Sequence, residues 1–235
     1  MKREYIFVGK AAFFPKEKML VFADLHLGYE EQAVGSGRFL HLRIYEQIKK
    51  DIGMIFDFLK EKEEVVEKIV ILGDVKHEFS GILGGEEREI LRFVEYLKGK
   101  LAFDGKIILV KGNHDNYVSG ILKRKNIGVV EKMIAGENLF IHGDELENAF
   151  DVKNKNVKRI FLGHIHPAVV LEMGAKKERY KCFLVGKYKG GEIIILPSFF
   201  PLVEGIDISA IEKKLKIKNK KVYVVVPYSV EVLEI

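Results

Sequence analysis

The stretch "KIILVKGNHDNY", residues 106–117, joins a run of aliphatic residues to a run of polar ones. Its first five residues have the length and the β-branched composition of a buried strand. Asn113, His114 and Asp115 follow almost at once, and three polar groups at the end of a buried strand cost stability unless each has a partner. They therefore either cap a turn or hold a ligand.

Four other aliphatic runs end in the same way. They span residues 19–23, 68–72, 138–141 and 159–162, and the polar clusters at their ends read "ADLH" (23–26), "GD" (73–74), "HGD" (142–144) and "GHIH" (163–166). In α/β sheets, ligands bind beyond the carboxyl ends of the strands. We therefore expect all five clusters to meet in one pocket.

Seven side chains in these clusters are candidate metal ligands. In an extended segment, residues i and i+2 project to the same side, so each Asp-x-His or His-x-His pair is expected to point into one pocket. The candidates are Asp24, His26, Asp74, Asn113, His142, His164 and His166. Seven ligands are more than one cation needs, and two divalent cations that share a carboxylate would use them all.

Three glycines precede candidate ligands. Gly73, Gly112 and Gly163 each allow a tight turn and a close approach of the backbone. A single Gly-Asp after a strand is a common turn signal and carries little weight. The five clusters together, holding five of the seven histidines, argue against a set of unrelated turns.

The spacing of apolar residues predicts the architecture. Residues 43–62 and 86–102 have apolar side chains at three- and four-residue spacings, which is typical of amphipathic helices. Strands alternate with helices up to about residue 165, and strands with short turns come after it. We expect one α/β domain over residues 1–235, with two packed mixed β-sheets flanked by helices and mostly antiparallel strands in the C-terminal part.

Composition limits the classes of function. The net charge of +5 permits an anionic partner such as nucleic acid, although the lysine-rich stretches 176–181 and 212–221 also fit solvated faces. Abundant lysine and glutamate, few glutamines and no tryptophan are typical of thermophile surfaces. The apolar runs are too short to span a membrane, and no secretory signal is evident, so we expect a cytoplasmic protein. The single Cys182 is expected to pack in a strand, so a metal site must use nitrogen and oxygen ligands.

The five clusters, in their order, resemble the motifs of the calcineurin-like metallophosphoesterases. That pattern is D-x-H, G-D, G-N-H-D/E, H and G-H-x-H, and it is complete here between about residues 19 and 170. The resemblance implies the β-sandwich of that family. The stretches "DLHLGY" (24–29) and "GDVKHEF" (73–79) resemble those of double-strand-break-repair nuclease subunits and of related small archaeal phosphoesterases. The stretch "LPSFFPLVEGID" (196–207) resembles a loop of that archaeal group and of ligase-associated endonucleases.

The resemblance also implies roles for individual residues. It places Asp24, His26 and His166 at one metal, Asn113, His142 and His164 at the other, and Asp74 between them. His114 would be the general acid that faces the substrate, and Asp115 would orient His114. Two histidines fall outside these implied roles. His77 would lie behind the ligands or touch the substrate, with a surface or packing role equally open. Arg38, next to His41, is a further conceivable phosphate contact, although a solvated loop is favoured.

These roles predict phosphodiester hydrolysis by in-line attack of a metal-bridging hydroxide. Mn²⁺ is the metal that we expect, and imidazole and carboxylate ligands also suit Fe, Zn²⁺, Ni²⁺ or Co²⁺. The substrate would be a phosphoester. If that phosphoester is a nucleic acid, the protein is a nuclease. The alternative is a phosphoesterase acting on nucleotides or cyclic nucleotides. A non-catalytic binding scaffold is disfavoured because no ligand position is lost. The oligomeric state is left open.

Overall fold

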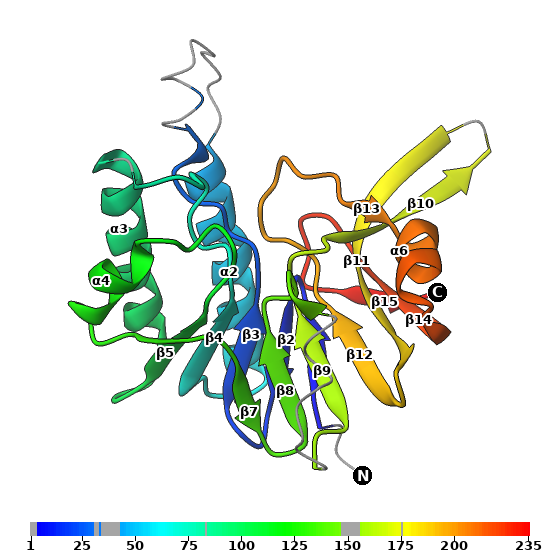
Figure 1. Ribbon diagram of the computed structural model, residues 1–235, viewed down its shortest axis with the longest axis horizontal. Helices are drawn as coiled ribbons and strands as arrows, with labels where there is room; N and C mark the ends of the chain where they lie inside the picture. The colour runs from blue at the N-terminus through cyan, green and yellow to red at the C-terminus, as the bar shows by residue number, and fades with distance from the viewer. Residues whose placement is uncertain (1–3, 31–32, 34–42, 83, 147–155, 175) are drawn as a thin grey trace.

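The computed structural model describes residues 4–30, 33, 43–82, 84–146, 156–174 and 176–235. Two mixed β-sheets pack face to face, and helices cover the outer face of each sheet (Figure 1). The expected α/β architecture of two packed sheets flanked by helices is confirmed.

The first sheet has the strand order β1-β2-β3-β4-β5-β6. β1, β2 and β3 pair antiparallel, and β3 to β6 pair parallel. The parallel strands are joined through helices, as parallel pairing requires. The strands are β1 (Ile6–Val8), β2 (Ala11–Phe14), β3 (Met19–Phe22), β4 (Lys68–Leu72), β5 (Lys106–Val110) and β6 (Gly128–Val130), and the helices are α2 (Ile44–Glu61), α3 (Gly84–Lys100) and α4 (Val118–Lys123).

The second sheet has the order β13-β10-β11-β12-β9-β8-β7, with β14 paired to β11 and to β15. β8, β9 and β12 pair parallel, whereas β10, β11, β12, β14 and β15 are linked by antiparallel pairs, as expected for the C-terminal part. The elements are β7 (Met133–Ala135), β8 (Asn138–Ile141), β9 (Arg159–Leu162), β10 (Pro167–Met173), β11 (Lys176–Tyr188), β12 (Gly191–Ile195), β13 (Ile206–Asp207), α6 (Ile208–Leu215), β14 (Lys218–Val225) and β15 (Val232–Glu234).

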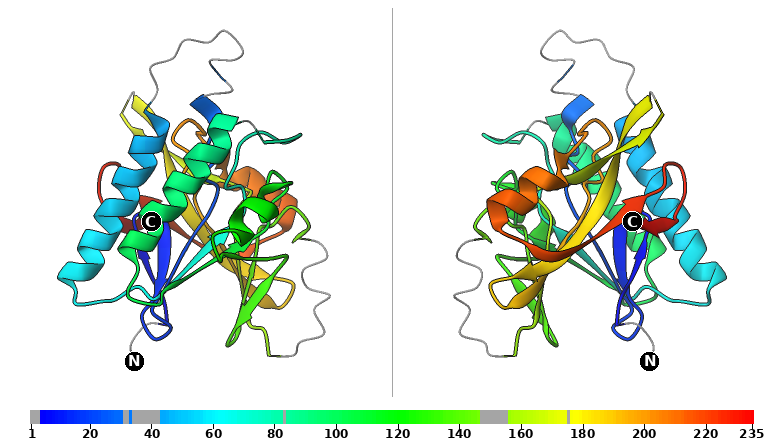
Figure 2. Two further views of the ribbon diagram at one scale, coloured as in Figure 1. Left: turned by 90° about the vertical axis from the view of Figure 1, so that its left-hand side faces the viewer. Right: turned by 90° about the vertical axis from the view of Figure 1, so that its right-hand side faces the viewer.

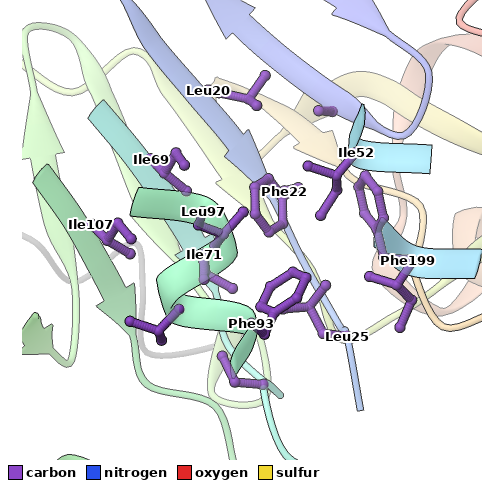
Figure 3. Close-up of a cluster of buried hydrophobic side chains, with 14 of the residues drawn as sticks. Leu20, Phe22, Leu25, Ile52, Ile69, Ile71, Phe93, Leu97, Ile107 and Phe199 are labelled. Carbon is purple, nitrogen blue, oxygen red and sulfur yellow. The ribbon is translucent and has the colours of Figure 1, made fainter. Parts of the chain in front are cut away.

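Apolar side chains fill three layers. The layer between the sheets is rich in aromatic residues, and the ring centroids of Phe7 and Phe183 lie 3.9 Å apart there. The second layer joins the first sheet to α2 and α3, where Phe22, Ile52 and Phe93 belong to one buried cluster (Figure 3). The third lies between the second sheet and α6. Figure 2 shows α2 and α3 together over the first sheet.

The structure differs from the sequence-based expectation in the C-terminal part. Only strands separated by short turns were expected there, but α6 lies between β13 and β14. Asp207 caps this helix by accepting a hydrogen bond from the Ser209 amide, and Ile208 and Ile211 bury its apolar side. No helix among the described residues is long and apolar enough to cross a membrane.

Candidate metal centre

Five loops from both sheets converge at one place. They follow β3, β4 and β5 of the first sheet and β8 and β9 of the second, and hydrogen bonds join them across the two sheets. Three groups of donor atoms form there, each with its atoms within 4.8 Å of one another. Asp24, His26 and His166 make one group, and Asp74, His142 and His164 make another. The third group, of His26, Asp74 and His114, overlaps both of these through His26 and Asp74.

Asp74 lies between the first two groups. Its Oδ2 atom is 3.7 Å from His26 Nε2 and 3.4 Å from His142 Nε2. Asn113 joins the second group, because its Oδ1 is 3.0 Å from His142 Nε2. All seven candidates from the sequence therefore lie together, with one carboxylate in contact with both groups.

A backbone carbonyl fixes the orientation of the His142 ring. Its Nδ1 donates a hydrogen bond of 2.9 Å to the Leu72 carbonyl, so Nε2 is the nitrogen that faces the pocket and Asp74. His164 Nδ1 lies 3.1 Å from that same Nε2 atom. Such a gathering of nitrogen and oxygen atoms suits a cation.

The backbone at the ligand positions corrects one expectation. Extended segments were expected to point the paired ligands into one pocket, but the backbone there is left-handed. The positive φ angles are 58° at Asp24, 47° at His26, 51° at Asp74, 62° at His164 and 50° at His166. Such conformations cost about 1–3 kcal/mol each and persist where neighbouring structure holds them, and five of them gather at this one place.

Two glycines make the close approach possible. A Cβ atom on Gly73, whose φ is +77°, would lie 2.2 Å from His142 Nδ1. A Cβ atom on Gly112 would lie 2.4 Å from Asp74 Oδ1. The expectation that these glycines let the backbone approach the ligands is confirmed.

Asp115 has a different role from the one expected. Its carboxylate is buried and accepts hydrogen bonds from the amides of Gly112 and Asp74, both at 2.8 Å, and of Val75 at 2.9 Å. These bonds tie the loop after β5 to the loop after β4. Asp115 thus positions the backbone of Asp74 rather than the ring of His114. Burial and the charge of Asp74 raise the pKa of Asp115 to about 6.

The His114 side chain is oriented by a backbone group. Its Nδ1 donates a 2.7 Å hydrogen bond to the His77 carbonyl, and its amide donates to Asp74 Oδ1 at 3.0 Å. The ring centroid lies 5.0 Å from that of His26. The His114 ring therefore lies at the edge of the donor groups. The His77 carbonyl binds Nδ1 of this ring and leaves Nε2 available.

The arrangement of these motifs agrees with a comparison of the sequence against family models. Residues 17–203 match the model of the calcineurin-like phosphoesterases, and this range includes every donor described above. The chain belongs to the calcineurin-like phosphoesterase family. No curated protein sequence matches it.

Solved structures resemble this calcineurin-like phosphoesterase in fold. The nuclease MPE of Pseudomonas putida is 20% identical over 98% of this chain and 100% of that chain, with a TM-score of 0.64. A novel archaeal phosphodiesterase is 14% identical over 92% of this chain and 98% of that chain, with a TM-score of 0.43.

The donors of this family member fit divalent cations. The buried atom His166 Nε2 has no hydrogen-bond partner among the described residues and lies 3.4 Å from Asp24 Oδ2. The Asp24 and Asp74 side chains are buried beside the imidazoles of His166 and His26. A cation would satisfy a buried nitrogen of this kind beside buried carboxylates, and the nitrogen and oxygen set suits first-row transition metals.

The pKa values show how strongly the donors interact. Burial opposes ionisation of Asp74, but the adjacent His142 and His26 hold its pKa well below the usual range. Burial opposes protonation of His142, but Asp74 and Asp24 raise its pKa to about 9. Burial lowers the pKa of His26 to about 4. His142 therefore carries a proton at neutral pH in the metal-free protein, and a bound cation would displace that proton because a metal ligand must be deprotonated.

Sequence reasoning missed two supports of this site. One is the His77 carbonyl, and a backbone contact leaves no signal in residue type. The His77 ring packs against Tyr29 and Phe200, at centroid distances of 4.8 and 5.9 Å. The other is the segment 198–200, whose Ser198 hydroxyl donates to the Asp24 carbonyl at 3.0 Å. Arg38 and His41 lie outside the described residues.

Proposed function

We propose that this calcineurin-like phosphoesterase hydrolyses phosphodiester bonds with two divalent cations. The observation that carries the proposal is the pair of donor groups in contact with one shared carboxylate, Asp74. In this proposal Asp24, His26 and His166 hold one cation, Asn113, His142 and His164 hold the other, and Asp74 bridges them. Mn²⁺ is the proposed metal, and the donor set also suits Fe, Zn²⁺, Ni²⁺ or Co²⁺.

Charge favours an anionic substrate. Two divalent cations beside the carboxylates of Asp24 and Asp74 leave a net charge of about +2, which attracts a phosphodiester and the more negative transition state. The chemistry that two bound cations supply is polarisation of the phosphate oxygens and activation of water for in-line attack on phosphorus.

His114 is the proposed general acid. The His77 carbonyl occupies its Nδ1 proton, so Nε2 is the atom that can give a proton to the substrate. As the bond between phosphorus and the leaving oxygen breaks, that oxygen takes the Nε2 proton, and the proton lost by the attacking water restores the ring afterwards. General acid help is typically worth about 10²–10⁴ in rate.

Other residues act through the ligands. Asp115 holds the amides of Gly112, Asp74 and Val75 and so fixes the loop that carries the bridging carboxylate. His77 fixes His114 through its carbonyl. The nuclease MPE of Pseudomonas putida shares this fold, so a nucleic-acid strand is among the diesters to test.

A substrate panel with Mn²⁺ tests the proposal. Bis(p-nitrophenyl) phosphate, p-nitrophenyl phosphate, a 2′,3′-cyclic nucleotide, and single- and double-stranded DNA are compared. We expect diester cleavage to exceed monoester cleavage, and DNA cleavage would identify a nuclease. Monoester hydrolysis with intact diesters would contradict the proposal.

Two variants separate acid from ligand. His114→Ala should lower turnover by about 10²-fold or more while metal analysis still finds about two ions per chain. His166→Ala should lose metal as well as turnover. Full activity of His114→Ala would show that another group supplies the proton.

A further inference from the structure

Two cavities meet the proposed metal centre on either side of Gly143 and Asp144. The larger has a volume of about 500 Å³ and is lined by Asn113 and His142, and the smaller has a volume of about 300 Å³ and is lined by His164. Gly143 and Asp144 line both. A phosphodiester carries two organic groups on its phosphorus, and each cavity is placed to receive one of them.

An exposed aromatic side chain stands at the larger cavity. Phe79 lines it, is 55% exposed, and has its ring centroid 5.5 Å from that of His114 at an interplanar angle of 86°. Most phenylalanines of this chain are buried, whereas Phe79 presents its ring beside the proposed general acid. An exposed aromatic ring at a polar cavity is a surface on which a flat ligand can stack.

The polar groups of this cavity limit the kind of ligand. Lys111 and Lys132 line it together with Glu131, Asp144 and Glu145, so the acids outnumber the lysines. Such a wall gives no attraction to a further chain of phosphates. It does offer donors and acceptors, including Asn116, to the polar edge of a neutral nucleobase.

The smaller cavity has another character. It is lined mainly by aliphatic side chains, among them Ile165, Ile206, Ile211 and Leu215. Of the described residues around it, none is a phenylalanine or tyrosine. The Phe79 ring therefore offers a base a stacking surface beside His114, and the described lining of the smaller cavity holds no phenylalanine or tyrosine for this purpose.

We propose that the larger cavity is a subsite for a nucleoside, and that Phe79 stacks on the base of the leaving nucleoside. This inference rests on the proposed phosphodiesterase function. The leaving oxygen must lie within reach of His114 Nε2, and Phe79 both contacts the His114 ring and lines the larger cavity. The base remains on Phe79 while the phosphorus–oxygen bond breaks and the leaving oxygen takes its proton from His114.

The kinetic test uses three dinucleoside monophosphates: one intact, and two in which one or the other nucleoside lacks its base. The leaving nucleoside departs without the phosphate, so the product that retains the phosphate shows which nucleoside was not the leaving group. For the unmodified protein, kcat/KM should fall about tenfold when the base is missing on the leaving side and less when it is missing on the other side. In Phe79→Ala, the kcat/KM for the intact substrate divided by the kcat/KM for the substrate without a leaving-side base should approach one, mainly through a change in KM. Phe79→Trp should restore the ratio of the unmodified protein.

Phe103→Ala is the matched control. Phe103 is 97% exposed and lies in the loop before β5, at the opposite end of the strands from the ligand loops. Phe103→Ala should show the same ratio of kcat/KM between the intact and the leaving-side abasic substrate as the unmodified protein. If Phe79→Ala kept that ratio too while still hydrolysing the diesters, the subsite would be rejected and the phosphodiesterase function would stand.

A binding measurement judges the subsite without turnover. A dinucleotide with 2-aminopurine on the leaving side and a methylene group in place of the leaving oxygen keeps its negative charge and cannot release the leaving nucleoside. Its fluorescence falls when the base stacks. Quenching should occur with the Mn²⁺-loaded protein and with Phe103→Ala, and it should be lost with Phe79→Ala. Equal quenching by both variants, or none by the unmodified protein, would overturn the inference even if no diester were hydrolysed.

Discussion

At the scale of the residue, the centre depends on backbone conformations that few residue types adopt readily. Asp24, His26, Asp74, His164 and His166 all have positive φ. Left-handed backbone is more frequent for Asp, Asn and His than for most residues and much rarer for bulky or β-branched ones. Ligand chemistry and backbone preference therefore select the same residue types at these positions.

A substitution of Gly73 should show how little room the site has. Gly73→Ala would place a Cβ atom 2.2 Å from His142 Nδ1 at a positive φ angle. We expect it to lower the free energy of unfolding by more than about 1 kcal/mol and to reduce bound metal. Chemical denaturation and elemental analysis measure both effects.

Gly120→Ala is the control for that change. Gly120 lies in α4, and a Cβ atom there would meet no other atom within 4 Å. This substitution should stabilise the protein by about 0.5–1 kcal/mol because alanine favours a helix. Equal effects of the two substitutions would contradict the close contact with His142.

The thiol of Cys182 should be inert in the folded protein. Burial, with a smaller effect of the Asp207 charge, raises its pKa to about 12. At pH 8 the thiolate fraction is then about a thousandfold below that of an ordinary cysteine. A disulfide reagent followed by absorbance should react in denaturant and hardly at all in buffer. Rapid reaction in buffer would show that β11 opens at this residue.

At the scale of the element, the sequence predicts the strands of the ligand loops better than it predicts the segment after residue 205. The five runs that precede the polar clusters are β3, β4, β5, β8 and β9, and both expected helices are present as α2 and α3. We did not predict α6 because the lysine-rich stretch 212–221, which begins within it, also fits a solvated face. Its signal was present in Asp207 as an N-cap and in Ile208, Ile211 and Leu215 at helical spacing.

The alternation of side chains along a strand did not predict the backbone conformation of the proposed ligand pairs. The pairs 24/26 and 164/166 do meet in one pocket, but through left-handed residues after the strands end. Hydrogen bonds from other loops hold this conformation, such as those of the Leu25 and His26 amides, both to the Asp74 carbonyl at 2.9 Å. Such bonds come from residues far away in the sequence, so local pattern does not reveal them.

The N-cap of α6 offers a test at this scale. Asp207→Ala removes the acceptor of the Ser209 amide and should lower the free energy of unfolding by about 1 kcal/mol. Asp207→Asn keeps an acceptor and should cost much less. Urea denaturation of both variants measures the difference. An equal cost would mean that the charge of Asp207 matters and its cap does not.

At the scale of the whole molecule, the proposed ligands divide between the two sheets. Loops of the first sheet carry Asp24, His26, Asp74 and Asn113, and loops of the second carry His142, His164 and His166. The aromatic layer between the sheets sets their separation. Bound cations would therefore connect the sheets at one edge of that layer.

Removal of metal should lower the thermal stability. A ligand that binds only the folded state at about 100 times its Kd adds about 2.7 kcal/mol to the free energy of unfolding. Calorimetry should thus find a lower Tm after treatment with EDTA and recovery of the Tm with Mn²⁺. His166→Ala should show a smaller recovery at the same Mn²⁺ concentration. An identical Tm with and without metal would contradict a centre shared by the two sheets.

The division of the ligands between the sheets has a consequence during biosynthesis. The proposed donors begin at Asp24 and end at His166, so a nascent chain would lack the complete donor set until His166 has left the ribosome. Folding of the first sheet alone would provide a fragment that holds only some of the proposed donors. The proposed phosphodiesterase activity would therefore begin only after both sheets have packed together.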